Sequence, residues 1–200
     1  MKVCRLVLLA VLALPAGAAA QRQLLFVGVP LTLKTPEPEE FELALDEVEL
    51  DWSESGSGPA APPNVVAFTA IVEQTRTTAV FKISGASTIE ALALIARQLE
   101  TANAPARADF VLYEPRRGRD PSTRRALSNT VALLLADPAD PDRVVAEYAS
   151  RDPQTLQGVP GAYVLNAGDP LSAIQLADTL SSRAGVKAAY PLLKRRQYIR

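Results

Sequence analysis

The sequence predicts an α+β protein. Its C-terminal part is expected to be a ferredoxin-like, split βαβ sandwich (β-α-β-β-α-β), preceded by an N-terminal mixed α/β region. Two observations predict the sandwich. An apolar strand, an Asp-Pro helix start and a second strand occur twice, and the turn GVPG at 158–161 joins the two copies as a hairpin. A third observation, two strand-like segments followed by a capped helix and another strand, predicts the mixed region.

Residues 1–20 are typical of a secretory signal peptide, because two basic residues precede an apolar run and the segment ends in small residues. We expect cleavage between Ala20 and Gln21, with Ala18 and Ala20 as the small residues ahead of the cut. The chain is therefore expected to be secreted or periplasmic. The apolar run is too short for a stable membrane span, although an uncleaved N-terminal anchor is the alternative.

Composition argues against most enzyme classes. The formal net charge is −1, so we expect no nucleic-acid partner. The chain has no histidine, and its one cysteine, Cys4, lies in the expected signal peptide. Serine and cysteine protease mechanisms need a histidine base, and zinc sites nearly always use His or Cys. We therefore expect no catalysis, no metal and no cofactor. Chemistry by a pair of carboxylates is the remaining enzymatic alternative.

The N-terminal region is expected to contain acidic strands over 21–52 and a linker over 53–64, which is rich in Gly, Ser and Pro. In FELALDEVELDW the apolar alternation shifts near Asp46–Glu47, which indicates a bulge or a turn. A ββαβ subdomain is predicted over 65–115. Its elements are strands at 65–72 and 79–83, a helix from the capping box Ser87–Glu90 to about Leu99, and a strand at 109–114.

A basic connector over 116–125 interrupts this pattern. It contains five arginines: Arg116, Arg117, Arg119, Arg124 and Arg125. Runs of charge are usually solvated, so an exposed connector is expected. The alternative is a secondary processing loop, because exposed basic loops are readily cut by proteases.

Residues 126–193 are expected to form the sandwich. A short strand at 131–136 precedes a helix that begins at Asp140–Pro141, and a second helix begins at Asp169–Pro170. In both, Asp caps the helix and Pro occupies the first position, where a missing amide hydrogen costs no hydrogen bond. The closing strand is expected at 186–192. Because VALLLA (131–136) is apolar on both faces, something must cover the sheet face opposite the helices, either the N-terminal half or a partner.

The segment AYVLNAGDPLSAIQLADTLSSRAGVKAAYPLLKRRQYIR resembles the end of the propeptide of secreted bacterial subtilisin-like serine proteases. It is most similar to those that carry a proprotein-convertase P-domain. The segments FVLYEPRRGRD (110–120) and TRRALSNTVALLLA (123–136) resemble the middle of the same propeptides. The resemblance covers 108–200, and 60–107 more weakly. The matching residues are Asp169, Pro170, Leu180, Gly185, Val186, Ala189 and Pro191.

This resemblance implies a ferredoxin-like propeptide that packs its open sheet on two helices of a catalytic domain and lays its tail in the active-site cleft as an extended strand. Such a propeptide is a folding chaperone and a temporary inhibitor. The basic tail, 194–200, would be the inhibitory and processing segment: Lys194, Arg195, Arg196, Gln197, Tyr198, Ile199 and Arg200. Cleavage is expected after Arg200, with Arg196 as the alternative. Ile199 before Arg200 departs from a dibasic convertase site.

The catalytic motifs of the protease family are absent from the sequence. The chain is thus expected to be a propeptide separated from its enzyme, with a subtilisin-like catalytic domain as partner. A stand-alone secreted protease inhibitor of the same shape is one alternative. A periplasmic structural module that binds a protein through its sheet face, and does not need its tail, is another.

Overall fold

The computed structural model of the chain describes residues 28–34, 38–54, 68–84, 86–138 and 142–195. The expected signal peptide with its cleavage site, most of the expected linker, the Asp140–Pro141 helix start and tail residues 196–200 lie outside the described residues. The strands are β1 (Gly28–Leu33), β2 (Glu39–Asp51), β3 (Phe68–Gln74), β4 (Thr78–Ile83), β5 (Arg107–Tyr113), β6 (Arg124–Leu135), β7 (Gln154–Thr155), β8 (Ala162–Asn166) and β9 (Val186–Arg195). The helices are α1 (Ile89–Ala102), α2 (Asp142–Val145) and α3 (Pro170–Ser181), and two 3-10 segments are η1 (Pro121–Thr123) and η2 (Ala146–Arg151).

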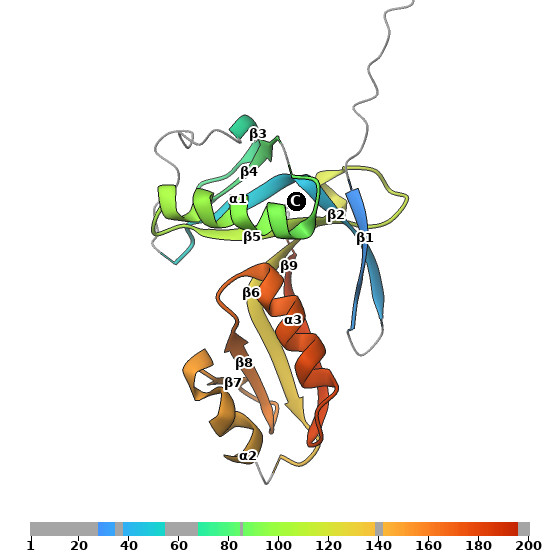
Figure 1. Cartoon of the computed structure of the whole chain (residues 1–200), viewed down its shortest axis with the longest axis vertical. Helices are drawn as coiled ribbons and strands as arrows, with labels where there is room; N and C mark the ends of the chain where they lie inside the picture. Colours follow the sequence, from blue (N-terminus) through green and yellow to red (C-terminus); the bar gives the residue numbers. More distant parts are fainter. Residues whose placement is uncertain (1–27, 35–37, 55–67, 85, 139–141, 196–200) are drawn as a thin grey trace, which may run out of the picture.

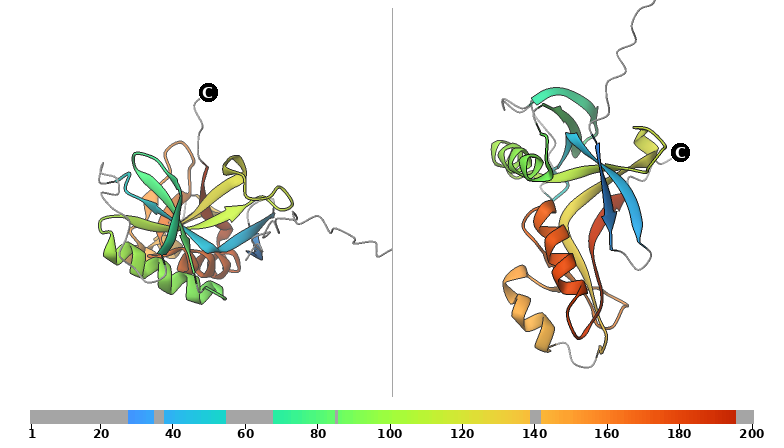
Figure 2. Two further views of the ribbon diagram at one scale, coloured as in Figure 1. Left: turned by 90° about the horizontal axis from the view of Figure 1, so that it is seen from above. Right: turned by 45° about the vertical axis from the view of Figure 1, so that its right-hand side comes forward.

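Within the described residues, these nine strands form one sheet, and every pair in it is antiparallel (Figure 1). The order is β3-β4-β2-β5-β6-β8-β7, with β1 added beside β2 and β9 beside β6. The three helices lie on one side of this sheet (Figure 2). The N-terminal strands with α1 make one half of the molecule, and β6, β8 and β9 with α3 make the other.

The prediction of a ferredoxin-like sandwich behind a mixed α/β region is wrong. The N-terminal region is strand-rich and continues into the same sheet as the C-terminal strands. The expected short strand at 131–136 is the end of a 12-residue strand, β6, which begins at Arg124. The strand expected ahead of the GVPG turn in the predicted hairpin is reduced to the two residues of β7. The sequence did not predict the first part of β6, because residues 124–130 are mostly polar and resemble a loop. The buried charge of Arg124 is neutralised by Glu73, which is far away in the sequence.

Two long strands, β2 and β6, each pair with three other strands. β2 pairs with β1 through its first part and with β4 through its second, while β5 follows its other edge. A register shift between Leu43 and Val48 in the β2–β5 pairing confirms the predicted bulge at Asp46–Glu47. β6 pairs with β5 and then with β8 along one edge and with β9 along the other. The β6 strand therefore belongs to both halves.

The core of the N-terminal half lies between the sheet and α1. Alternate residues of β2, β4 and β5, such as Leu50, Phe81 and Phe110, point to this side and are fully buried against Leu92 and Leu99 of α1. The helix begins one residue later than the predicted capping box, because the side chain of Thr88, not Ser87, accepts the hydrogen bond from the amide of Ala91.

The core of the C-terminal half lies between β6, β8, β9 and α3, with the odd-numbered β6 residues Val131, Leu133 and Leu135 facing the helix. Asp169 caps α3 as predicted and accepts hydrogen bonds from the amide and the hydroxyl of Ser172. The same carboxylate accepts a hydrogen bond from Arg97 of α1 at 2.6 Å. One helix cap therefore also joins the two halves.

Candidate functional site

Ala132 and Leu134, near the end of β6, lie on an apolar sheet face that has no helix over it in the described structure. Ala132 pairs with Val164 of β8 on one side and with Tyr190 of β9 on the other, and Leu134 pairs with Ala162 and Ala188. Because side chains alternate along a strand, these residues point away from α3. We call the set Ala132, Leu134, Val164, Ala188 and Tyr190 the open face.

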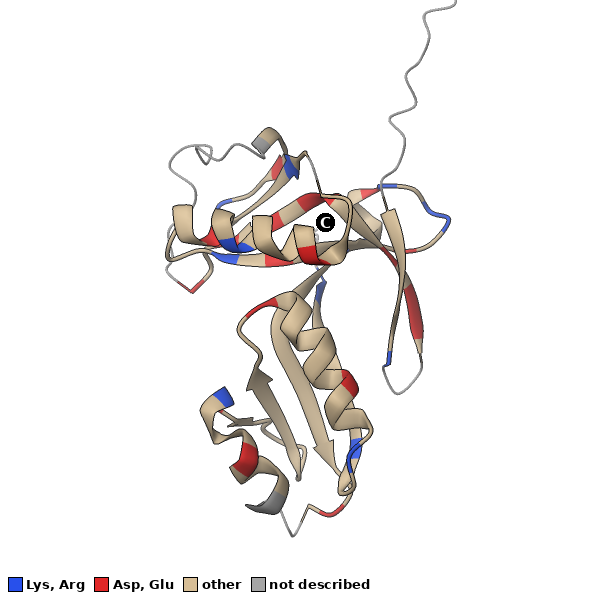
Figure 3. Cartoon of the chain, in the orientation of Figure 1, with Lys and Arg blue, Asp and Glu red and all other residues tan. Residues whose placement is uncertain are grey.

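The open face is partly accessible and uncharged. Its five members are half-buried, and none belongs to the three apolar clusters found among the described residues. β6 from Ala126 onward and β8 contain no charged residue, and Figure 3 shows charges gathered mainly around the N-terminal half. An apolar, uncharged sheet face of this kind is typical of a protein-binding surface. Of the two covers expected for the second face of VALLLA, the N-terminal half does not lie over it in the described structure, and a partner stays a prediction.

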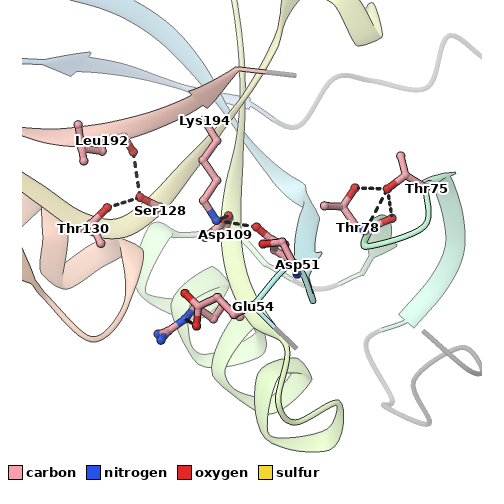
Figure 4. A network of polar contacts seen from close by, with 11 residues as sticks. Asp51, Glu54, Thr75, Thr78, Asp109, Ser128, Thr130, Leu192 and Lys194 are labelled. Carbon is pink, nitrogen blue, oxygen red and sulfur yellow. Dashed lines mark hydrogen bonds and ion pairs between the residues drawn. The ribbon is translucent and has the colours of Figure 1, made fainter. Parts of the chain in front are cut away.

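The C-terminal strand β9 forms one border of the open face, and a half-exposed lysine near its end is paired with two buried carboxylates. Lys194 Nζ lies 2.8 Å from Asp51 Oδ2 of β2 and 2.8 Å from Asp109 Oδ2 of β5 (Figure 4). The side chain of Asp109 is 1% exposed and that of Asp51 is 9% exposed. Lys194 is paired with Ala126, so its side chain extends across β6 to reach the carboxylates. A small residue at position 126 suits this crossing.

The environment of this cluster shifts the pKa of each group. Burial raises the pKa of Asp109 to about 7, and Glu49 and Asp51 add to the rise, while Lys194 opposes it. Burial also raises the pKa of Asp51, but hydrogen bonds from Lys194 and Ser53 outweigh that effect and lower it. Burial lowers the pKa of Lys194, but the two aspartates outweigh it and raise the pKa to about 12. Lys194 is therefore charged at any ordinary pH.

This geometry divides the predicted basic tail. Lys194 and Arg195 belong to β9, where Arg195 pairs with Arg125 of β6. Lys194 is a structural anchor in the described structure rather than a member of a free tail. The remaining predicted tail residues, Arg196–Arg200, lie outside the described residues and follow directly from the end of β9.

The predicted basic connector is also divided. Arg116 and Arg117 are exposed, as expected of a solvated loop. Arg119 donates to both Asp46 and Glu47, and Arg125 is paired with Glu114. Arg124 is buried, with its side chain 3% exposed and 2.5 Å from the carboxylate of Glu73. The structure therefore does not bring the five arginines together as one exposed loop.

Sequence reasoning missed the network around Arg124. Its Nε donates to the hydroxyl of Tyr113 at 3.2 Å, and that hydroxyl donates to Glu47 Oε2 at 2.6 Å. Burial, with the neighbouring carboxylate of Glu47, raises the pKa of Tyr113 well above its usual range, so the phenol stays protonated and can donate. The alternation of Glu47, Glu49 and Asp51 in β2 was the available signal, because it places all three on the face opposite the apolar core.

Other kinds of site have no support in the described part of the chain. No group of three or more His, Cys, Asp or Glu side chains in it is arranged to hold a metal ion. No helix within the described ranges has both the length and the apolar character needed to cross a membrane.

Comparison with known proteins identifies no relative. No family model matches the sequence, no curated protein resembles it significantly, and no solved structure matches its fold. The open face and the anchored end of β9 are therefore the features on which a functional proposal must rest.

Proposed function

We propose that the chain is the propeptide of a secreted bacterial subtilisin-like serine protease, acting as an intramolecular chaperone and a temporary active-site inhibitor. The observation that carries the proposal is the open face, bordered by a strand that continues directly into Arg196–Arg200. A partner that buried this face would also receive the following segment as an extended chain, which is the way a peptide adds to a sheet edge. The sequence resemblance supplies the class of partner, and the proposal does not depend on a ferredoxin-like fold.

The chemistry of the open face supports a protein partner with apolar helices or strands. A half-buried patch with one tyrosine and no charge loses little polar hydration when it is covered. Aromatic side chains in interfaces often contribute most of the binding free energy, which makes Tyr190 the expected main anchor of the contact. Proteases of the proposed partner class unfold slowly, which implies a high barrier between their folded and unfolded states. A preformed surface that lowers this barrier during folding would act as a chaperone.

The direct test is inhibition. The purified chain, with residues 1–20 removed, would be titrated against a panel of secreted bacterial subtilisin-like proteases with a chromogenic peptide substrate. We expect a tight inhibition constant for at least one member, and recovery of activity when that denatured catalytic domain refolds in the presence of the chain. If no member is inhibited or assisted, the proposal is wrong.

Variants assign the inhibition to the open face and the tail. Leu134→Glu places a charge in the face and is expected to weaken inhibition by more than about tenfold. Leu94→Glu is the matched control, because Leu94 is 59% exposed on α1 at the other side of the sheet. Deletion of 196–200 is expected to weaken inhibition by a similar factor. The deletion must start at Arg196, because removal of Lys194 would also disturb the fold.

The coding sequence beyond Arg200 separates the two inhibitor alternatives. Continuation into a domain with Asp, His and Ser catalytic motifs supports a propeptide, and a stop codon supports a free inhibitor. A periplasmic binding module predicts a third result, in which a partner is bound through the open face but deletion of 196–200 has no effect on binding.

A further inference from the structure

The end of β9 is attached to the sheet as a separate short block. Pairing of β9 with β6 is interrupted between Leu127 and Val131. Beyond this break, the block consists of Leu193, Lys194 and Arg195 paired with residues 127, 126 and 125. The interruption is bridged by Ser128, whose hydroxyl donates to the carbonyl of Leu192 at 3.1 Å (Figure 4). Such a block has few ladder hydrogen bonds of its own and can open without the rest of the strand.

Lys194 supplies the strongest contact of this block. Its ammonium group spans β6 and contacts carboxylates on two further strands, each at 2.8 Å. Leu193 adds a partly buried contact with the N-terminal core. In the described structure, the outer edge of β9 has no strand beside it, so the block is held from one side only.

We propose that Leu193–Arg195 is a detachable end of β9 and that the contact of Lys194 with Asp109 and Asp51 is a proton-operated latch, closed while Asp109 is ionised and loosened when Asp109 takes up a proton. Opening would release residues 193–195 from the sheet. The latch is a property of this chain alone, and it stands whether or not the proposed protease partner is correct.

The direction of the pH effect follows from the groups that face Asp109. Glu49, directly opposite on β2, and Asp51 raise its pKa, whereas Lys194 from β9 lowers it. The β6 residue that Lys194 crosses, Ala126, does not titrate, and Arg107 of β5 is directed to Glu54 instead. When Lys194 leaves, Asp109 loses the one group that favours its ionised form. The proposed opening moves only the end of β9 and leaves β2, β5 and β6 in place, so that Asp109 stays buried. An open state of this kind binds a proton more tightly than the closed state, and acidification through about pH 7 favours it.

Protonation of Asp109 has the opposite effect on global unfolding. The folded-state pKa of Asp109, about 7, is above its ordinary value of 3.8. The native state consequently holds this proton more tightly than the unfolded chain does, and protonation of Asp109 stabilises the fold as a whole. Acidification from pH 8 to pH 6 should thus loosen the end of β9 while the contribution of Asp109 to global stability increases. Simple acid unfolding would not produce this combination.

Hydrogen-exchange mass spectrometry of the full chain tests the latch, with rates expressed as protection factors so that the intrinsic effect of pH is removed. From pH 8 to pH 6, we expect protection of Leu193–Arg195 to fall on the order of fivefold, while protection of β5 is unchanged or higher. In Lys194→Met, protection of the block should be about tenfold lower at pH 8 and no longer vary with pH. In Asp109→Asn, the block should show the low-pH behaviour at both pH values.

Lys187→Met is the matched control, because Lys187 is on the same strand, is exposed and makes no ion pair within the described residues. It should retain the full pH response of the unmodified chain. The proposal is overturned if Lys194→Met keeps the pH response, or if the block and β5 lose protection together in the unmodified chain. Asp109→Asn preserves side-chain shape, so it remains informative even if Lys194→Met fails to fold.

Discussion

Replacement of Arg124 by methionine gives the sharpest test of the buried polar network. The guanidinium group contacts Glu73 at 2.5 Å and the hydroxyl of Tyr113 at 3.2 Å, and its side chain is 3% exposed. Methionine retains most of the aliphatic volume but removes the charge and the donors. Because one partner of a buried ion pair is removed and the other remains, the expected cost is about 3–5 kcal/mol.

The structure places the cost at the lower end of this range. The side chain of Glu73 is 24% exposed, so water can partly solvate the carboxylate after the substitution. Glu47 is 4% exposed but keeps its ion pair with Arg119 and its hydrogen bond from Tyr113. We therefore expect a loss of about 3 kcal/mol in the free energy of unfolding, which is a large part of the stability of an ordinary domain.

Arg117→Met is the control from the same basic segment. Arg117 is 69% exposed and pairs with Glu114, and an exposed pair of this kind contributes about 0–1 kcal/mol. Urea unfolding would be followed by the fluorescence of Trp52, which is the only tryptophan and is buried in the N-terminal core. An unchanged dependence on urea concentration would show that the shift is one of stability. A difference of less than about 1 kcal/mol between the two variants would refute the buried network.

Three further predictions use the same purified chain. In the unmodified chain, the raised pKa of Asp109 should make the unfolding free energy fall by up to about 1.4 kcal/mol per pH unit as pH rises from about 4 to 7. Asp109→Asn should remove this contribution, which urea titrations at several pH values would measure. Within 114–125, brief trypsin digestion should cut after Arg116 or Arg117 and spare Arg124, as fragment masses would show. Asp169→Ala should lower stability by about 1–2 kcal/mol in thermal unfolding at pH 7 through loss of the α3 cap.

Local patterns in the sequence were sufficient for the N-terminal elements. The strands around the turn at 74–77, the helix ending near Leu99 and the bulge at Asp46–Glu47 all depend on alternation or capping within a short window. The Asp-Pro start of α3 was predictable for the same reason. Each of these features is specified by neighbouring residues, so a single sequence was enough to find them.

The long strand β6 was not predictable because its stability depends on distant residues. Arg124 and Ser128 look like loop residues until Glu73 and the carbonyl of Leu192 are brought beside them. The same holds for Lys194, which the sequence groups with the following arginines. Only the fold shows that Lys194 forms ion pairs with Asp51 and Asp109. Tertiary contacts thus changed both the fold class and the boundary of the proposed tail.

The second face of the sheet changes character along β6, and this change bounds the proposed binding site. At Arg124 and Ala126 the face carries two ion pairs, each with one buried member: Arg124 with Glu73, and Asp109 with Lys194. From Ala132 onward the face is apolar and lacks a partner in the described structure. A protein docked on the open face would therefore meet, at one end, the Lys194 latch. The end of β9 would then be held in a fixed place relative to the partner while the latch is closed, and opening of the latch would release Leu193–Arg195 without altering the docked surface.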